Sequence, residues 1–437
     1  MKSSTRSFQP GIMAQRASEQ AIGFLMQQGL ENADCLSLAA GFVDPVTLPV
    51  DSVRQVAQQV LSQTSSGRIA LQYGTTQGAE SLRSALRRHL ADLEGPGSRA
   101  ADLPLERLVL TTGSQQLLAL VTQALFNEGD ICLVAAPTYF VYLGVLDGVA
   151  AKVIPIHTDD SGMCPQALEV ELRRLSDAGQ LHRVKLVYVV SDHDNPAGIS
   201  VSAERRPQLV DTVRRWSTDN HIFLLEDAAY RELRYDGPHL PSLWSYDNAG
   251  HDDRAHVILA QTFSKSFAPG LRVGFGVLPQ ELVKPFLDLK GNEDFGSTHL
   301  SQNIMASVLE SGEYRTHVTM LQNSYRLKRD AMLTAAEKWF ADIDGVTWLR
   351  PNGGLYVWMT LPSHIETGFG SKLFRQATEV NKVMYVPGEL SYPSTWAQRP
   401  KNQMRLSFGV LDSAGIYEGM RRLAAAVRAV MAAETHG

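Results

Sequence analysis

The chain has few cysteines and no long apolar run. Cys35, Cys132 and Cys164 stand far apart in 437 residues and form no C-x-x-C pattern, so neither a disulfide framework nor a zinc knuckle is indicated. Isolated thiols fit a reducing compartment, and we expect a cytoplasmic protein. No apolar run is long enough to cross a membrane, and the first thirty residues lack the basic start and apolar core of a secretion signal. We therefore expect no membrane partner.

The chain also lacks an excess of charge of either sign. Its 41 Lys and Arg against 46 Asp and Glu give a formal net charge of -5, which provides no field to attract nucleic acid. With 44% hydrophobic and 20% charged residues, the chain can bury a large core. Its length is too great for one small core and predicts a large domain with a smaller companion, or two comparable domains.

Short runs rich in Val, Ile and Leu alternate with longer helical patterns. The runs that we expect to form strands are RLVLTT (107–112), DICLVAA (130–136), VKLVYVV (184–190), HIFLLED (221–227), HVILAQT (256–262) and VGFGVL (273–278). This alternation predicts an α/β fold with a mostly parallel sheet. Because the runs are almost continuously apolar, we expect helices on both faces of the sheet. None of them is followed by G-x-G-x-x-G, which argues against a nicotinamide-dependent dehydrogenase.

The pattern changes along the chain. The segment SQQLLALVTQALFNEG (114–129) predicts a helix, since its apolar residues recur at helical spacing and Gly129 suits a helix end. After about residue 305 come long helices, such as the one around 325–340, and two alternating strands at 354–361 and 403–410. That tail predicts a second, smaller domain, with a loop over 391–402.

Polar residues follow the predicted strands, at the edge where such sheets bind ligands. They are Gly113-Ser114-Gln115, Pro137-Thr138-Tyr139, Asn195-Pro196, Asp227 with Tyr230, and Ser264-Lys265. Taken singly, these have ordinary structural explanations. A tight turn with Ser114 as helix N-cap explains the first as well as an anion site does. Tyr139 alone is more often a core residue, and turn chemistry accounts for Asn195-Pro196.

Glu226 and Asp227 end one strand together, so the strand alternation sends them to opposite sides. One carboxylate can enter the cleft while the other caps a helix or meets solvent. A buried carboxylate needs a cationic partner, and there are two candidates. One is Lys265, and the other is a protonated heteroaromatic nitrogen of a ligand, with Lys265 held as an imine. His193 has no metal-spaced or nucleophilic partner, and we expect it to be hydrogen-bonded or exposed.

Nine motifs stand in order along nearly the whole chain. They are LSLAAGFVDPVTLP (36–49), LQYGTTQGAESLR (71–83), TTGSQQ (111–116), APTY (136–139), DNPAG (194–198), EDAAY (226–230), TFSKSFAPGLRVGF (262–275), PNGGLYVW (351–358) and MRLSFG (404–409). Together they resemble the class I/II aminotransferases, pyridoxal-phosphate enzymes of fold type I, and within them the branch of 2-aminoadipate and kynurenine aminotransferases. The resemblance implies a large cofactor domain over 49–310, a smaller α+β domain over 311–437, and an N-terminal segment, 1–48, that joins the small domain.

The resemblance implies roles for the matching residues around pyridoxal 5'-phosphate. Lys265 is expected to form the Schiff base with the cofactor aldehyde and later to move the proton between the substrate Cα and the cofactor. Asp227 is expected to keep the pyridine nitrogen protonated, which makes the ring an electron sink. Tyr230 and Asn195 are expected to hydrogen-bond the phenolic oxygen, and Tyr139 to stack on the ring. The residues expected at the phosphate are Gly113, Ser114, Gln115, Thr262 and Arg272, joined by Tyr73 from a second subunit.

Arg405 is expected to bind the substrate α-carboxylate bidentately, near Asn195 and the backbone of Gly41. The alternation in MRLSFG places Arg405 on the polar face of an otherwise apolar strand, although a surface salt bridge would explain it equally well. Tyr73, considered alone, is an ordinary turn tyrosine. If its family role holds, the active site lies at a subunit interface and the protein is an obligate homodimer.

Some positions depart from the usual family pattern. His193 stands where an aromatic residue is usual and Asp194 where a neutral polar residue is usual; the extra carboxylate either alters the electrostatics at the cofactor or faces solvent. Thr262 replaces a serine and keeps the hydroxyl. Within 13–29, Arg16 is the nearest candidate to bind a side-chain carboxylate of the substrate, but a helix-surface role fits it better. We expect a cis bond at Asn195-Pro196.

The implied reaction is a two-stage, ping-pong transamination, in which an L-amino acid gives its nitrogen to the cofactor and a 2-oxo acid, with 2-oxoglutarate expected, takes it up. A C–S β-lyase on the same fold is the main alternative, and it would release ammonia and pyruvate without an oxo acid. An effector-binding domain of a transcription regulator would need a basic winged-helix module, and with roughly 35 residues before LSLAAG we expect none.

Overall fold

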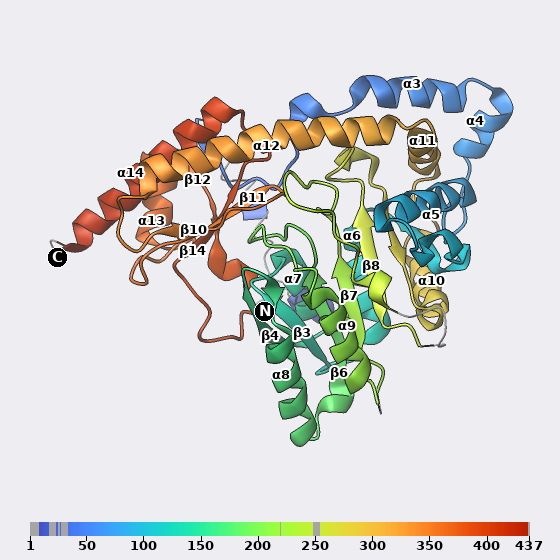
Figure 1. The fold of residues 1–437 in the computed structure, drawn as a ribbon, viewed down its shortest axis with the longest axis horizontal. Coiled ribbons are helices and arrows are strands. Elements are labelled where there is room, and N and C mark those ends of the chain that lie inside the picture. The colour runs from blue at the N-terminus through green and yellow to red at the C-terminus, as the bar shows by residue number, and fades with distance from the viewer. Residues whose placement is uncertain are drawn as a thin grey trace, which may run out of the picture.

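An eight-stranded mixed sheet forms the centre of the larger half of the molecule (Figure 1). The computed structural model describes residues 8–16, 23–24, 27, 34–218, 220–247 and 254–435. The strand order is β2-β9-β8-β7-β6-β3-β4-β5. The bounds are β2 Leu108–Thr111, β3 Ile131–Ala136, β4 Lys152–Asp159, β5 Gly162–Met163, β6 Val184–Val190, β7 Phe223–Asp227, β8 Val257–Thr262 and β9 Gly274–Val277. The strands β8, β7, β6, β3 and β4 run parallel, so the six predicted strands and the mostly parallel sheet are confirmed.

Three strands of this sheet, β9, β4 and the two-residue β5, differ from the sequence-based expectation. β9 runs antiparallel to both β2 and β8, because it follows β8 through a short connection that holds only the turn η6 (Pro269–Leu271) and no crossover helix. The strand β4 was not predicted, since Pro155 interrupts its apolar run and much of the strand is not buried.

Helices cover both faces of this sheet, as predicted. They are α5 Glu80–Glu94, α6 Ser114–Leu125, α7 Phe140–Gly148, α8 Pro165–Asp177, α9 Arg205–Trp216, α10 Gln280–Asp294 and α11 His299–Glu310. Alternate strand residues enter two separate apolar cores: Val134 belongs to the core shared with α6, α7 and α10, and Leu133 to the core shared with α5, α8, α9 and α11. The strands are therefore buried on both sides.

The predicted helix over 114–129 is too long. α6 ends at Leu125, and Phe126 has an extended backbone. The next residues form a turn of their own, in which the Asn127 N–H donates to the Asp130 carboxylate and the Asp130 N–H to the Asn127 carbonyl. This local hydrogen bonding competes with the helix, and Gly129 takes its positive φ of 81° inside that turn.

The second half of the molecule contains a four-stranded sheet of order β10-β11-β14-β13. Its bounds are β10 Thr347–Trp348, β11 Tyr356–Thr360, β13 Val386–Pro387 and β14 Gln403–Ser407, and the helices here are α12 Glu313–Phe340, α13 Lys372–Arg375 and α14 Ser413–Thr435. Both predicted strands of the tail are confirmed. Figure 1 shows α12 running along the top of the molecule from the large sheet to the small one, with α14 beside its far end.

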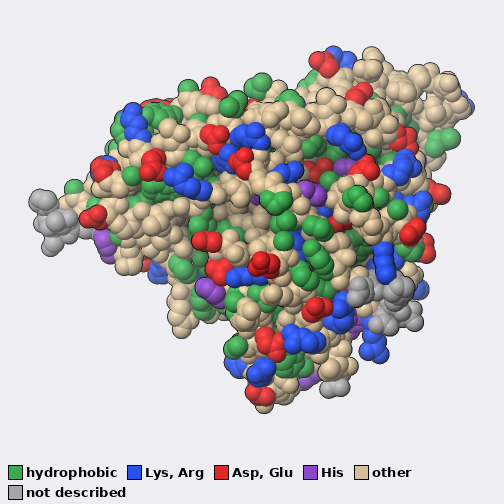
Figure 2. Space-filling model, viewed as in Figure 1, with side chains coloured by type: hydrophobic (Ala, Val, Ile, Leu, Met, Phe, Trp, Pro, Cys, Tyr) green, Lys and Arg blue, Asp and Glu red, His purple; other side chains and the backbone are tan. Residues whose placement is uncertain are grey.

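The segment 36–70 connects the part of the molecule around the small sheet with the part around the large sheet. β1 (Leu36–Ser37) pairs in parallel with β12 (Val383–Met384), whereas α3 (Val50–Leu61) and α4 (Thr64–Ala70) extend beyond α11 at the other end (Figure 1). Acidic and basic side chains are interspersed over the face seen in Figure 2. Within the described residues, no helix is both long and apolar enough to span a bilayer.

Candidate active site

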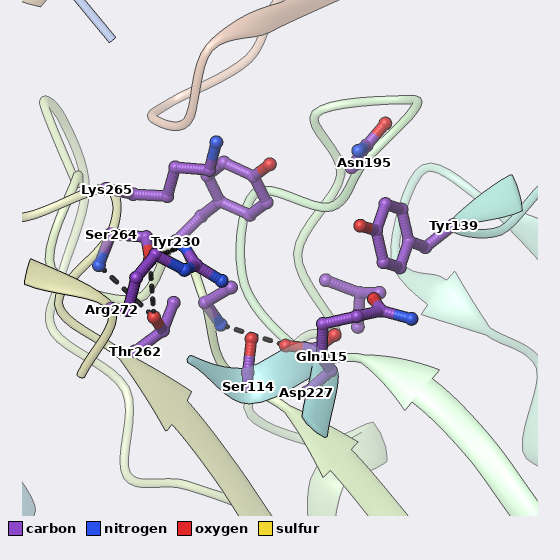
Figure 3. A pocket seen from close by; sticks show the side chains of 12 residues that line it. Ser114, Gln115, Tyr139, Asn195, Asp227, Tyr230, Thr262, Ser264, Lys265 and Arg272 are labelled. Atoms are coloured by element: carbon purple, nitrogen blue, oxygen red, sulfur yellow. Dashed lines mark hydrogen bonds between the residues drawn. The ribbon is translucent and has the colours of Figure 1, made fainter. Parts of the chain in front are cut away.

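A cavity of about 150 Å³ lies at the carboxyl ends of the central strands (Figure 3). Its lining residues are Ser114, Gln115, Tyr139, Val190, Asn195, Asp227, Ala229, Tyr230, Thr262, Ser264, Lys265 and Arg272. Most of the predicted site residues are therefore brought together by the fold. Gly113 and Gly41 contact members of this set, and Arg405 binds Asn195.

Asp227 is a buried acid at the end of β7. Its carboxylate accepts hydrogen bonds from the Tyr188 hydroxyl at 2.9 Å and the Ala229 N–H at 3.2 Å. It forms no ion pair within the described part of the chain. Burial raises the pKa of Asp227 to about 6, although these two hydrogen bonds act in the opposite direction and lower it. An acid in this state is stabilised by a cation that enters the cavity.

The neighbouring acid, Glu226, points to the opposite side of the sheet. Its carboxylate oxygens accept the N–H groups of Leu243 and Trp244 at 3.0 and 2.9 Å, at the start of the turn η5 (Trp244–Tyr246). The expectation that the two acids separate, one toward the cleft and one as a cap, is confirmed.

Lys265 reaches the cavity from the loop after β8. Its Nζ donates to the Gly41 carbonyl at 2.8 Å, which ties the N-terminal segment to the cleft. Burial lowers the pKa of Lys265, with Arg405 and Arg272 acting in the same direction and Tyr356 against them. When the pKa of a lysine is lowered, a larger fraction of its side chain carries a neutral amine at a given pH.

The start of α6 faces the cavity with unpaired polar groups. Its N-cap is Gly113, with a φ of 75° that favours glycine, and not Ser114 as the turn interpretation required. A Cβ on Gly274 would lie 2.5 Å from the Gly113 carbonyl carbon, so β9 packs directly against this turn. The buried Oε1 of Gln115 has no hydrogen-bond partner among the described residues, and the first N–H groups of the helix can receive an anion.

Arg272 stands opposite that helix start. A Cβ on Gly113 would lie 2.7 Å from its guanidinium. The guanidinium makes only weak hydrogen bonds to the Ser264 hydroxyl and to the Pro269 and Thr112 carbonyls, at 3.2 to 3.5 Å. No acid pairs with it in the described ranges. Thr262 lies below, with its hydroxyl bonded to Ser264 at 2.9 Å (Figure 3).

Arg405 is buried without an acid. Its Nη1 donates to Asn195 Oδ1 and its Nη2 to the Ala39 carbonyl, both at 2.8 Å, while Nε has no partner in the part of the chain that the structure describes. Only 4% of the residue is exposed, so the surface salt bridge considered for it is wrong. A buried guanidinium is costly unless a carboxylate completes it, and a ligand can supply that group.

The turn that carries Asn195 is held by both unusual residues before it. The Asp194 carboxylate accepts the Ile199 N–H at 2.8 Å and is buried, which raises the pKa of Asp194 to about 7. His193 is also buried, with Nδ1 3.2 Å from the Ser200 hydroxyl, and burial lowers its pKa to about 4. Asp194 therefore does not face solvent. The predicted cis bond at Asn195-Pro196 is present, and Ala136-Pro137 is also cis.

Tyr73 does not reach this cavity. It is 78% exposed and packs edge-on against Phe295, with ring centroids 5.5 Å apart. Arg16, in α1 (Ile12–Arg16), forms a salt bridge of 2.9 Å with Glu128. The surface role expected for Arg16 is confirmed, and the other residues of 13–29 lie largely outside the described ranges.

Tyr356, which was not predicted as a site residue, joins several of these residues. Its hydroxyl lies 3.1 Å from that of Tyr230, and the Arg405 guanidinium stands 4.3 Å above its ring. Phe140 also lies near Arg405, at 5.7 Å from the guanidinium carbon. Tyr356 belongs to the PNGGLYVW motif, and the alternation of β11 puts it on the face opposite Val357, but neither signal indicates which residues it contacts.

Comparison with known proteins identifies the family. The model of aminotransferase class I and II matches residues 33–423. The chain belongs to the class I and II aminotransferases. It is 34% identical over 405 residues to aromatic-amino-acid aminotransferase 1 of Thermococcus litoralis, covering 92% of this chain and 90% of that one. It is also 31% identical over 397 residues to 2-aminoadipate transaminase of Thermus thermophilus, covering 91% of each.

A solved structure agrees along nearly the whole chain. The kynurenine aminotransferase of Pyrococcus horikoshii in complex with PMP superposes with a TM-score of 0.85 at 32% identity, over 97% of each chain. The expected fold type I architecture and the expected branch are confirmed. The aminotransferase is a pyridoxal-phosphate enzyme that transfers amino groups.

The cavity fits this cofactor by its own chemistry. Among the described residues it offers a buried acid without a cation, a helix start whose first N–H groups can receive an anion, and an arginine without an acid. These groups could hold a cationic ring and a phosphate at opposite ends, with the Lys265 amine between them.

Proposed function

We propose that this aminotransferase moves the amino group of an L-amino acid to a 2-oxo acid, with 2-oxoglutarate as acceptor, in two half-reactions at this one cavity. The observation that carries the proposal is the convergence of Lys265 and Asp227 on the cavity, each without an opposite charge among the described residues. Such perturbed groups in a cleft are typical of catalytic sites.

Each cofactor contact is proposed from the chemistry of the lining residue. Asp227 would meet the pyridine nitrogen, Tyr230 and Asn195 the phenolic oxygen, and Tyr139 the ring face. The phosphate would be held by Gly113, Ser114, Gln115, Thr262 and Arg272, together with Tyr73 of the partner subunit. Pyridoxal phosphate, when bound there, supplies an electron sink for the pair released at the substrate Cα.

The chain's own residues then orient the substrate and move its proton. Arg405 would bind the α-carboxylate with guanidinium N–H groups beside Asn195. Lys265 would take the proton from the substrate Cα on its neutral amine and would then donate it on the cofactor side. Its lowered pKa supports this role, and the Gly41 carbonyl holds the amine in place beforehand.

We also propose a homodimer with shared sites and the division into 1–48, 49–310 and 311–437. The dimer is supported by exposed apolar side chains on one stretch of the chain, which are Val50, Leu61, Ile69, Leu71 and Tyr73. The pairing of β1 with β12 supports assigning the N-terminal segment to the small domain. Three free thiols support a cytoplasmic location.

A single-turnover assay tests the proposed reaction. Purified enzyme loaded with pyridoxal phosphate is mixed with one amino acid at a time and no oxo acid. We expect one equivalent of oxo acid per site, no ammonia, and no further turnover until 2-oxoglutarate is added. The donor that bleaches the cofactor absorbance fastest identifies the substrate side chain.

The same assay separates the alternative chemistry. A C–S β-lyase would keep turning over cystathionine without an acceptor and release ammonia and pyruvate continuously. Sustained ammonia release without an oxo acid would therefore overturn the proposal, whereas a burst that stops at one equivalent supports it.

A further inference from the structure

Tyr356 lies beside the cavity, in contact with Tyr230 and Arg405, although no step above uses it. In the register of β11 and β14, Tyr356 pairs with Ser407 and Trp358 with Arg405. Tyr356 and Arg405 are therefore diagonal neighbours on the same face of the small sheet. The Arg405 guanidinium carbon stands 4.3 Å from the centroid of the Tyr356 ring, which is close enough for a cation–π contact.

The hydroxyl of Tyr356 is enclosed by the site. It lies 3.1 Å from the Tyr230 hydroxyl, and a Cβ on Gly41 would stand 3.1 Å from it. Gly41 in turn accepts the hydrogen bond from Lys265. Only 1% of Tyr356 is exposed, so this hydroxyl depends on Tyr230 for its hydrogen bond.

The surroundings of the two tyrosines shift the pKa values of their hydroxyls in opposite directions. Burial raises the pKa of Tyr230 well above its ordinary value. Burial acts the same way on Tyr356, but Arg405, Lys265 and the hydrogen bond with Tyr230 together outweigh it and leave the pKa of Tyr356 below its ordinary value. The 3.1 Å contact allows either hydroxyl to donate; because Tyr230 lines the cavity whereas Tyr356 is enclosed behind it, the arrangement that serves the cavity is the one in which Tyr356 donates to Tyr230 Oη. The proton of Tyr230 is then free to point into the cavity that Tyr230 lines.

We propose that Tyr356 is a positioning residue, whose hydroxyl turns the Tyr230 proton toward the phenolic oxygen of the cofactor and whose ring supports Arg405 for the substrate carboxylate. This inference rests on the site assignment proposed above. The two parts of one side chain thus serve the cofactor and the substrate separately, and substitutions can separate them.

The test compares Tyr356→Phe and Tyr356→Leu with the wild type. The matched control is Tyr385→Phe, which removes a hydroxyl equally buried in the small domain and bonded to the Thr367 carbonyl at 3.0 Å. The first readout is a pH titration of the bound-cofactor absorbance, and the second is the KM of the amino donor.

In Tyr356→Phe, Tyr230 loses a hydrogen-bond donor and stabilises the phenolic oxyanion of the cofactor less. We expect the midpoint of the cofactor titration in Tyr356→Phe to rise by about 0.5 to 1 pH unit. The KM of the amino donor should stay within about twofold of the wild-type value.

Tyr356→Leu also removes the ring, and we expect it to raise KM about 3- to 30-fold. Because the hydroxyl acts through Tyr230, Tyr356→Phe added to Tyr230→Phe should shift the midpoint no further. If Tyr356→Phe does not fold, the titration midpoint of Tyr356→Leu tests the loss of the same hydroxyl, and it too should rise.

The outcomes distinguish this inference from the proposed function. A wild type without cofactor absorbance would overturn both. A wild type that binds the cofactor, with Tyr356→Phe titrating like Tyr385→Phe, would overturn the role of the hydroxyl alone. An unchanged KM in Tyr356→Leu would overturn the role of the ring.

Discussion

At the scale of single residues, the site is defined by buried charges that lack partners. Asp227 and Arg405 are each about 4% exposed, and neither pairs with an opposite charge within the described ranges. Protein interiors rarely keep an ion in this state, because its desolvation is not compensated. In our account the cofactor and the substrate supply the missing charges, so each residue can be tested by a ligand-binding measurement.

The first prediction concerns the pH dependence of cofactor binding. The cationic ring requires the Asp227 carboxylate, and Asp227 becomes protonated in the cofactor-free protein below about pH 6. Affinity for pyridoxal phosphate should therefore fall as the pH is lowered through 6, by up to about tenfold per unit. Asp227→Asn should bind about 10²- to 10⁴-fold more weakly and lose this part of the slope. Fluorescence titration of the cofactor-free wild type and Asp227→Asn, at several pH values, measures the affinity and its pH slope. Protonation of the cofactor phosphate contributes equally to both slopes, so the difference between them reports Asp227. Identical slopes would contradict the assignment.

The second prediction concerns Arg405. Arg405→Lys keeps the charge but loses the two parallel N–H groups that match a carboxylate. We expect KM for amino and oxo acids to rise about 10- to 100-fold, with the cofactor absorbance unchanged. Steady-state kinetics with both substrates checks this, and an unaltered KM would show that the carboxylate binds elsewhere.

At the scale of elements, the phosphate end depends on how closely β9 packs against the start of α6. A Cβ on Gly274 would meet backbone atoms of Gly113 and Ser114 at 2.5 and 2.6 Å, and backbone can yield only by moving the helix start. Gly274→Ala should therefore destabilise the protein by about 1–3 kcal/mol and lower cofactor affinity at least tenfold. Gly148→Ala, at the end of α7 with no atom within 4 Å of its new Cβ, serves as the control and should change neither. Thermal unfolding and cofactor titration give the comparison.

The elements also explain what the sequence could predict. Apolar runs such as 184–190 and 256–262 identified strands because burial on both faces leaves a continuous signal, and the residues after them met at one edge by topology alone. Tyr356 could not be predicted in the same way. Its contact with Arg405 depends on the register of β11 against β14, nearly 50 residues later in the chain, and local periodicity does not contain that register. The antiparallel β9 was not predicted because its pairing depends on contacts beyond the local pattern, and the early end of α6 because the local turn of Asn127 and Asp130 competes with the helix.

At the scale of the whole molecule, the proposed dimer completes the site. Tyr73 is 78% exposed, so in our account it contributes to the phosphate site of the partner subunit. We predict that Lys265→Ala and Tyr73→Ala chains, each of low activity alone, complement one another when unfolded together and refolded at equal amounts. Random pairing gives heterodimers in which one of two sites is intact, so activity should reach about a quarter of the wild type. Activity that does not rise above the parents would contradict a shared site.

The central claim is that Lys265 holds the cofactor covalently, and borohydride reduction followed by peptide mass mapping tests it most directly. The account predicts that the wild type carries one reduced pyridoxyl-phosphate group, on Lys265, and that Lys265→Ala loses both this label and the cofactor absorbance. A label on another lysine, or a Lys265→Ala variant that keeps the absorbance and turns over at the wild-type rate, would contradict it.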